Sequence, residues 1–353
     1  MADARNVRPG ASPPGHAHGG SRSAQRDVAS PGGILLVRPS SLGDIVHAMA
    51  IVSDLAAHCP QAPVDWVAEE AFVPLVRLDP RVRHVVPLGL RRWRGALLAA
   101  STWREANTFR QVLRRERYAA IIDLQEQVKG ALISRTARGP RHGFDRNSIR
   151  EPVATWLHDV HHQVERQQHF VDKCRALAAA AIGYRVDRPA RWQFVPPATA
   201  TAMPPGRYAI VFHATSRFDK LWPEDAWRMV LAQLAAAGIT TLLPWGSADE
   251  EQRSRRLAAG ATAAVVPPRQ SLPELAALIR DAEVVVGVDT GLTHLAAAMG
   301  TATVAVFTTT DPALAGVARA GPHAADVGGY GVVPAPAVVL AAIGGLLHRA
   351  PQC

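Results

Sequence analysis

The fold is decided by the stretch ILLVRPSSLGDIVH, which occupies residues 34–47. Its first four residues, all apolar, predict a buried strand, and the turn through Pro39 leads into an amphipathic helix ending near His58. A strand followed at once by such a helix is the first half of a βαβ unit. We therefore expect a parallel sheet covered by helices.

The same alternation continues through the first half of the chain. Further strands are expected at 64–67, 82–86 and 118–124, and further helices at 108–117 and 168–181. Residues 32–188 are assigned to one doubly wound domain.

A proline-rich stretch at 189–206, which contains Pro196, Pro197, Pro204 and Pro205, predicts an interdomain linker. A second α/β domain is expected at 207–335, with strands at 208–213, 239–243, 265–266, 283–288 and 303–307 and helices at 223–237, 248–258 and 272–280. A C-terminal helix and tail are expected at 336–353. Two Rossmann-like domains in series place the carboxyl ends of both sheets around one cleft. Epimerases and phosphorylases share this architecture, so the function must be argued from the residues of the cleft.

Composition limits the class of protein. The 353 residues are 48% hydrophobic and 20% charged, as expected for a globular protein of two domains. Residues 1–31 are rich in Ser, Pro, Gly, Ala and Arg and lack the apolar core of a signal peptide, which predicts a disordered extension. The three widely spaced cysteines match no disulfide or metal site and favour a cytoplasmic location.

The excess of positive over negative charge lies in the first half of the chain. Residues 77–150 hold 17 Lys and Arg against 6 Asp and Glu, whereas residues 207–353 hold 11 against 12. Either a polyanionic partner docks on the first domain, or its surface is simply basic and solvated. A basic nucleic-acid-binding protein is the alternative from another class. We expect no nucleic-acid partner, because no recognised DNA- or RNA-binding motif is present.

The turn after the first strand has neither the glycine spacing of a dinucleotide fold nor a P-loop. It does place a carboxylate, Asp44, at the carboxyl end of that strand. Asp44 is either a helix cap or a group that acts in the cleft.

Three segments of the second domain carry groups suited to an anionic sugar nucleotide. The segment HATSRFDKLWPE, residues 213–224, offers Thr215, Ser216 and Lys220 to a diphosphate, unless these groups are only a solvated helix start. The segment LPWGSADEE, residues 243–251, places Glu250 either toward sugar hydroxyls or merely in the first turn of a helix.

The segment VDTGLTH, residues 288–294, breaks a buried strand into a helix whose free N–H groups would face an anion. In it, Asp289 could accept from a sugar hydroxyl, and His294 is either near the ligand or packed in the helix.

The order and spacing of these four segments resemble the lipopolysaccharide heptosyltransferase I family over roughly residues 33–312. Further stretches that match that family include Asp65-Trp66-Val67 with Glu69-Glu70, Arg91-Arg92-Trp93-Arg94, Arg150-Glu151-Pro152 and Gln167-Gln168-His169. The resemblance implies a GT-B fold and inverting transfer of L-glycero-D-manno-heptose from ADP-heptose to the Kdo of Kdo2-lipid A. It implies no cofactor and no essential metal, and it places the enzyme at the cytoplasmic face of the inner membrane.

The resemblance also assigns roles. Asp44 becomes the general base; Thr215, Ser216 and Lys220 hold phosphate, which Thr290 and Gly291 cap; and Glu250, Gln270 and Asp289 contact ribose, adenine and heptose, with His294 nearby. Arg91, Arg92 and Arg94 are expected to bind the anionic acceptor, with Trp93 at the lipid interface. One departure is Glu126, which stands where the family has glycine.

Two related functions remain alternatives. A heptosyltransferase II-like enzyme should have a glycine-rich turn in place of Ala214-Thr215-Ser216-Arg217. A nucleotide-sugar epimerase on the same fold would turn over ADP-heptose without an acceptor.

Overall fold

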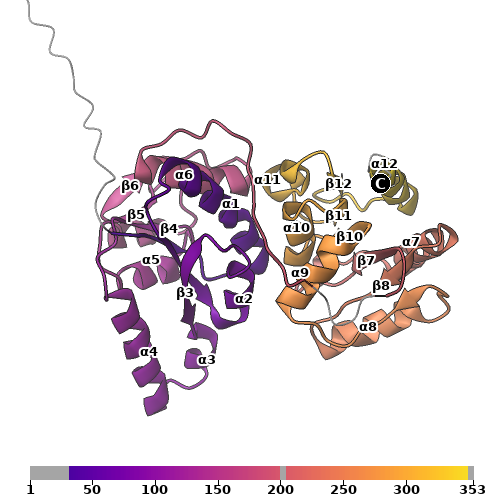
Figure 1. The fold of residues 1–353 in the computed structure, drawn as a ribbon, viewed down its shortest axis with the longest axis horizontal. Coiled ribbons are helices and arrows are strands. Elements are labelled where there is room, and N and C mark those ends of the chain that lie inside the picture. The colour runs from indigo at the N-terminus through magenta and orange to yellow at the C-terminus, as the bar shows by residue number, and fades with distance from the viewer. Residues whose placement is uncertain (1–31, 199–203, 349–353) are drawn as a thin grey trace, which may run out of the picture.

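The computed structural model describes residues 32–198 and 204–348, which form two six-stranded sheets flanked by helices (Figure 1). The predicted extension at 1–31, part of the predicted linker and the last five residues lie outside the described residues. The architecture is the two-domain α/β arrangement expected from the sequence.

The first sheet has the strand order β3-β2-β1-β4-β5-β6, and all its neighbouring strands are parallel. Its strands are β1 (Ile34–Val37), β2 (Val64–Glu69), β3 (Val82–Leu88), β4 (Ala120–Asp123), β5 (Arg141–Phe144) and β6 (Val160–His162). Its helices are α1 (Leu42–His58), α2 (Val73–Val76), α3 (Leu90–Arg94), α4 (Ala100–Leu113), α5 (Val128–Ser134) and α6 (Phe170–Ile182).

The central strand β1 shows why the opening apolar run has no polar member. Ile34 and Leu36 pack on one face of the sheet with α1 and α6, whereas Leu35 and Val37 pack on the other face with Phe109 of α4. A central parallel strand is covered on both faces, so every position of it must be apolar.

The second sheet has the order β12-β11-β10-β7-β8-β9, again parallel throughout. Its strands are β7 (Tyr208–Phe212), β8 (Thr240–Leu242), β9 (Ala264–Val265), β10 (Val284–Val288), β11 (Thr303–Phe307) and β12 (Ala324–Gly328). Its helices are α7 (Glu224–Ala236), α8 (Ala248–Ala258), α9 (Leu272–Asp281), α10 (Gly291–Ala298), α11 (Pro312–Ala315) and α12 (Pro336–Leu347). The C-terminal helix α12 packs against α7 and β11 and so completes this domain.

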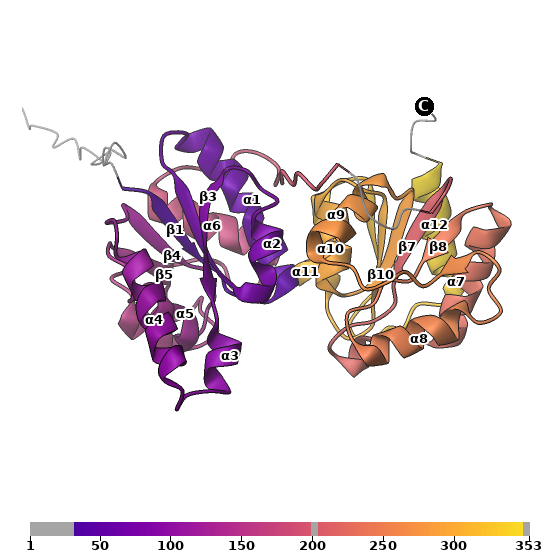
Figure 2. The same cartoon turned by 60° about the horizontal axis from the view of Figure 1, so that its bottom comes forward.

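The elements that sequence patterns did not reveal lie mostly at the sheet edges. Strands β5, β6 and β12 are short and carry polar residues, and β6 and β12 each pair with one strand among the described residues. An edge strand is only partly buried, so it lacks a clear apolar pattern. The helix expected at 108–117 begins earlier, at Ala100, and forms a hairpin with α3 that projects from the first domain (Figures 1 and 2). No helix in the described part of the chain is long and apolar enough to cross a membrane.

The domains meet where α1 contacts α10 and α2 contacts α9 (Figure 2). The predicted linker is tied to both domains. On the first domain, the indole of Trp192 donates to the Val46 carbonyl at 2.7 Å. On the second, Arg280 donates to the carbonyl oxygens of Pro197 and Ala198 at 2.8 and 3.0 Å.

One buried ion pair joins α6 to α1. The Arg175 guanidinium donates to both carboxylate oxygens of Asp54, at 2.7 and 2.9 Å, and its side chain is 1% exposed. Removing one member of such a pair leaves the other charge buried without a partner.

We predict that Asp54→Ala lowers the free energy of unfolding by about 3 kcal/mol or more. Asp225→Ala, which removes the exposed partner of Arg228, is the matched control and should change it by less than about 1 kcal/mol. Equilibrium urea denaturation of both variants measures the difference. Equal effects of the two substitutions would contradict a structural role for the buried pair.

Candidate active site

A cleft of about 620 Å³ lies between the domains and is lined by both of them. The first domain contributes Gly43, Asp44, His47, Phe72, Arg91 and Phe170, and the second contributes Thr215, Ser216, Lys220, Asp289, Gly291 and His294. A second cavity, of about 360 Å³, shares Leu42, Phe72, Thr215, Ser216 and Thr290 with the first. The two therefore form one continuous site that extends into the second domain.

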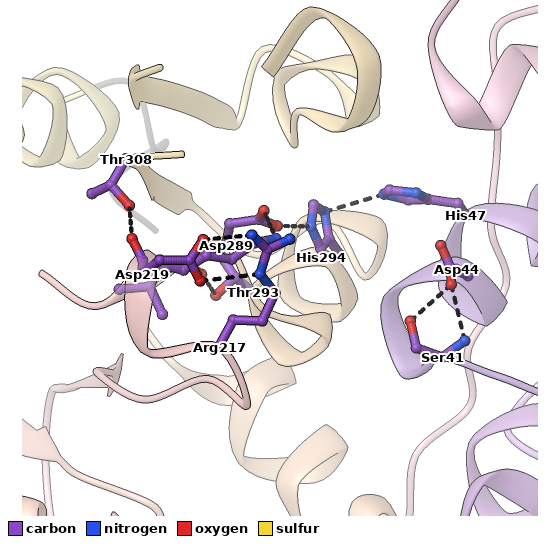
Figure 3. A network of polar contacts seen from close by, with 11 residues as sticks. Ser41, Asp44, His47, Arg217, Asp219, Asp289, Thr293, His294 and Thr308 are labelled. Atoms are coloured by element: carbon purple, nitrogen blue, oxygen red, sulfur yellow. Dashed lines mark hydrogen bonds and ion pairs between the residues drawn. The ribbon is translucent and has the colours of Figure 1, made fainter. Parts of the chain in front are cut away.

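Asp44 is both a helix cap and a cleft residue, so the two interpretations of the sequence are compatible. Its Oδ2 accepts from the backbone N–H and the hydroxyl of Ser41 at 2.9 and 2.8 Å (Figure 3). It also pairs with Arg38 at 2.7 Å. Burial raises the pKa of the Asp44 carboxyl, but the charge of Arg38 and the bonds from Ser41 outweigh it and hold that pKa below its usual range. The carboxylate is thus deprotonated at neutral pH.

The turn from β10 into α10 brings a second helix N-terminus to the cleft. A Cβ on Gly291 would lie 2.3 Å from Leu42 Cδ2 and 2.7 Å from the backbone nitrogen of Gly43, so only glycine fits there. The first turns of α1 and α10 therefore meet across the domain boundary. Both helix N-termini add positive partial charge to this part of the cleft.

A chain of polar contacts runs through this turn. Lys220 Nζ donates to Asp289 Oδ2 at 2.5 Å. Asp289 Oδ1 lies 3.0 Å from His294 Nε2, and His294 Nδ1 lies 3.2 Å from His47 Nε2 (Figure 3). Burial raises the pKa of Asp289, but the hydrogen bonds and charges of His294 and Lys220 hold it well below its usual range. Lys220 is therefore held at the cleft by a carboxylate that stays ionised.

The remaining predicted donor residues line the cleft as well. Thr215 and Ser216 lie where its two parts join, while Glu250 and Gln270 line the part that extends into the second domain. Glu250 also accepts from the Gly246 backbone N–H at 2.7 Å, so it stabilises its own turn. The Gln270 side chain donates to the Pro268 carbonyl at 2.9 Å, and its oxygen is buried without a hydrogen-bond partner within the described residues.

The three predicted acceptor arginines differ in their surroundings. Arg91 lines the cleft, with its guanidinium 5.8 Å from the centre of the Phe72 ring. Arg92 instead pairs with Glu70 and Glu105, each at 2.7 Å. Arg94 is exposed and does not line the cleft. Arg91 is thus the one of the three that the fold brings to the predicted base.

Sequence reasoning missed two residues near Asp44. His47 lies one turn further along α1 and lines the cleft, but a lone histidine in a helix gave no signal. Lys129 donates to Ser40 Oγ at 3.2 Å. Burial, followed by the charges of Arg38, Arg94 and Arg91, lowers the pKa of Lys129 despite the opposing effect of Glu69. These four cations, Arg38, Arg91, Arg94 and Lys129, are called the basic cluster below.

A further departure noted in the sequence has a structural counterpart. Glu126 adopts a φ of 59°, a left-handed conformation that favours glycine. Its carboxylate pairs with Lys173, whose ammonium lies 4.9 Å from the centre of the Phe144 ring.

Comparison with known proteins gives consistent matches. The family model described as glycosyltransferase family 9 (heptosyltransferase) matches residues 106–327. Lipopolysaccharide heptosyltransferase 1 of Escherichia coli K12 is 39% identical over 286 residues, which cover 80% of this chain and 90% of that protein. The protein of the same name from Pseudomonas aeruginosa is 37% identical over 80% of each chain.

Solved structures agree. The E. coli heptosyltransferase WaaC with ADP superposes with a TM-score of 0.81 at 35% identity, covering 89% of this chain and 99% of that one. The same enzyme with ADP-2-deoxy-2-fluoro heptose gives a TM-score of 0.78 at 34% identity, covering 90% and 99%.

Proposed function

Because this chain belongs to glycosyltransferase family 9, the heptosyltransferases, we propose that it transfers L-glycero-D-manno-heptose from ADP-heptose to the Kdo of Kdo2-lipid A. The single observation that carries this proposal is the cleft, where Asp44 of one domain faces Lys220, Thr215 and Ser216 of the other. This is the arrangement that an inverting transfer needs. A base stands on the acceptor side and groups for a leaving diphosphate stand on the donor side.

The donor is bound by the second domain. Thr215, Ser216 and the first turn of α10 are placed for the diphosphate, and the continuous cavity beside Glu250 and Gln270 takes the nucleoside. Both oxygens of Asp289 are engaged by Lys220 and His294, so this carboxylate orients the lysine and accepts from a heptose hydroxyl with its remaining lone pairs.

In the reaction, an acceptor hydroxyl oxygen attacks the anomeric carbon of heptose while Asp44 takes its proton. The bond between that carbon and the β-phosphate oxygen breaks, and ADP leaves from the opposite face with its electron pair. Lys220, the hydroxyls and the helix N-terminus stabilise the charge on the departing phosphate, and no cofactor or metal takes part in this scheme. Attack opposite the leaving group inverts the configuration.

The acceptor docks on the first domain, where the basic cluster suits the carboxylates of Kdo and the phosphates of lipid A. The α3–α4 hairpin supports docking at the membrane surface, because it exposes Leu97, Leu98 and Trp103 beside arginines. Trp93, which we expected at the lipid interface, is half-buried instead and donates to Glu105 at 2.9 Å. The exposed hairpin side chains replace it in the proposal of a peripheral enzyme on the cytoplasmic face of the inner membrane.

The first-heptose activity fits better than its rivals. The relatives named heptosyltransferase 1 reach 39% identity, whereas a heptosyltransferase 3 of E. coli reaches 24%. The turn at 214–217 also lacks the glycine-rich sequence expected of a heptosyltransferase II.

Incubation with ADP-heptose and Kdo2-lipid A, followed by mass spectrometry, tests the proposal. We expect one added heptose and one ADP released per acceptor. Turnover of ADP-heptose without acceptor would favour an epimerase. Transfer only to an acceptor that already carries one heptose would favour a heptosyltransferase II-like enzyme.

We predict that Asp44→Asn folds and binds ADP normally but transfers heptose at least about a hundredfold more slowly, the scale of a positioned proton transfer. The asparagine oxygen can still accept from Ser41, so the helix cap is largely retained. Asp44→Ala should lose the same activity and, in addition, about 1 kcal/mol of stability. Single-turnover rates measure the chemical step. Near-normal turnover by folded Asp44→Asn would leave Asp44 as a cap alone.

We predict that Lys220→Ala loses transition-state stabilisation of about 2 to 4 kcal/mol, because a positive charge beside the leaving phosphate is removed. The measurement is kcat/KM for ADP-heptose, with Arg228→Ala on the solvent face of α7 as the control. Chelators should leave wild-type transfer intact. Full activity of Lys220→Ala, or loss of wild-type activity with a chelator, would contradict this role.

We predict that Arg91→Gln and Arg94→Gln raise the acceptor KM and its dependence on salt, while the donor KM stays within about twofold. Arg92→Gln should have a smaller effect, because its charge is already balanced by two glutamates. Steady-state kinetics at two ionic strengths distinguish the three. A raised donor KM with an unchanged acceptor KM would show that these arginines bind the donor and would contradict the prediction.

A further inference from the structure

His47 is a cleft residue for which the proposed chemistry has no role. It lies one helical turn after Asp44 on α1, so the two side chains share a face of that helix. The residue is 6% exposed, and its ring is surrounded by His294, His169 and Phe170, with ring centres 4.5, 5.7 and 5.9 Å away. The packing fixes the ring in one orientation.

The hydrogen bond of His47 crosses from one domain to the other. Its Nε2 lies 3.2 Å from Nδ1 of His294, which belongs to α10 (Figure 3). Other contacts bridge the same boundary: His169 bonds the Gly316 carbonyl at 2.9 Å, and Arg319 pairs with Asp172 at 2.7 Å. Of these, the histidine pair is the one that reaches the residues of the proposed reaction.

Both ring nitrogens of His294 have a hydrogen-bond partner. A carboxylate only accepts, so His294 donates its Nε2–H to Asp289. Burial and the neighbouring His294 and His169 lower the pKa of His47 well below its usual range, against the opposing charges of Asp44 and Asp289. A neutral His47 has one protonated and one bare ring nitrogen, so its Nε2 can either donate to Nδ1 of His294 or accept from it. Both nitrogens of the His294 ring are thereby held.

We propose that His47 is a positioning residue that holds Lys220 and Asp44 in the relative positions that the reaction needs. Through His294 it holds Asp289, and through Asp289 it holds Lys220, while its own helix carries Asp44. Transfer needs the base, the anomeric carbon and the leaving phosphate in line at the same moment. The hydrogen bond between the histidines forms only when the two domains hold these relative positions.

The inference rests on the proposed transferase activity and predicts a change in kcat rather than in binding. His47→Ala should lower kcat roughly tenfold, because alignment is lost, while the Kd of ADP stays within about twofold. His47→Gln should recover much of the rate, since its amide can donate to His294 or accept from it at nearly the same place. His58→Gln, at the far end of α1, is the matched control and should behave as wild type.

A double-mutant cycle with His294→Ala gives the sharper test. If the bond between the two rings carries the effect, the double variant should have the same kcat as His294→Ala alone. Kinetics, ADP titration calorimetry and thermal denaturation are measured on each full-length variant. Should His47→Ala fail to fold, His47→Asn, whose amide is too short to reach His294, replaces it in the cycle.

Several results would overturn the proposal. The first is an unchanged kcat in His47→Ala, and the second is a double variant in which the two effects on kcat multiply. The third is a loss of activity in both His47→Ala and His47→Gln that matches only the loss of folded protein. Wild-type enzyme that fails to transfer heptose would instead defeat the proposed function. Wild-type transfer combined with a fully active His47→Ala defeats only the role of His47.

Discussion

The close approach of two helix N-termini, at Gly43 of α1 and Gly291 of α10, is the constraint on which the site depends. A side chain on Gly291 would collide with Leu42 and with the backbone of Gly43, so the two first turns can meet only because this position has no Cβ. Their meeting brings the carboxyl end of β1 next to that of β10. Asp44 and Asp289, which are far apart in the sequence, thus line one cleft.

The same contact explains why the charged residues of the cleft form two separate sets, one on each domain. On the second domain, Lys220 is held by Asp289, so its positive charge is fixed near the helix N-terminus rather than free to move. On the first domain, Arg38 balances Asp44, and the rest of the basic cluster extends outward from it. The two sets of cations thus belong to different domains, as the proposed binding of an anionic donor and an anionic acceptor on opposite sides of the cleft requires.

Much of this could be predicted from the sequence, because buried central strands have an unmistakable pattern. The run at Ile34 identified the first sheet, and the four segments that follow strand ends supplied Asp44, Lys220 and Asp289, all of which line the cleft. The arginines at 91, 92 and 94 could not be distinguished, because their difference depends on Glu70 and Glu105, which other elements bring to Arg92. The role of His47 could not be predicted for the same reason, because its partner lies 247 residues further along the chain. Residues whose role depends on tertiary contact leave no local pattern.

The two domains also differ in net charge, so the charge distribution of the molecule is asymmetric. Basic residues gather on the domain that carries the projecting α3–α4 hairpin, whereas the other domain is almost neutral, so the charge of the protein is asymmetric along its length. In the membrane docking proposed above, the field of an anionic bilayer would turn the hairpin toward the surface. The nearly neutral domain would then face the solution, and a soluble nucleotide sugar could enter without first crossing the negatively charged layer.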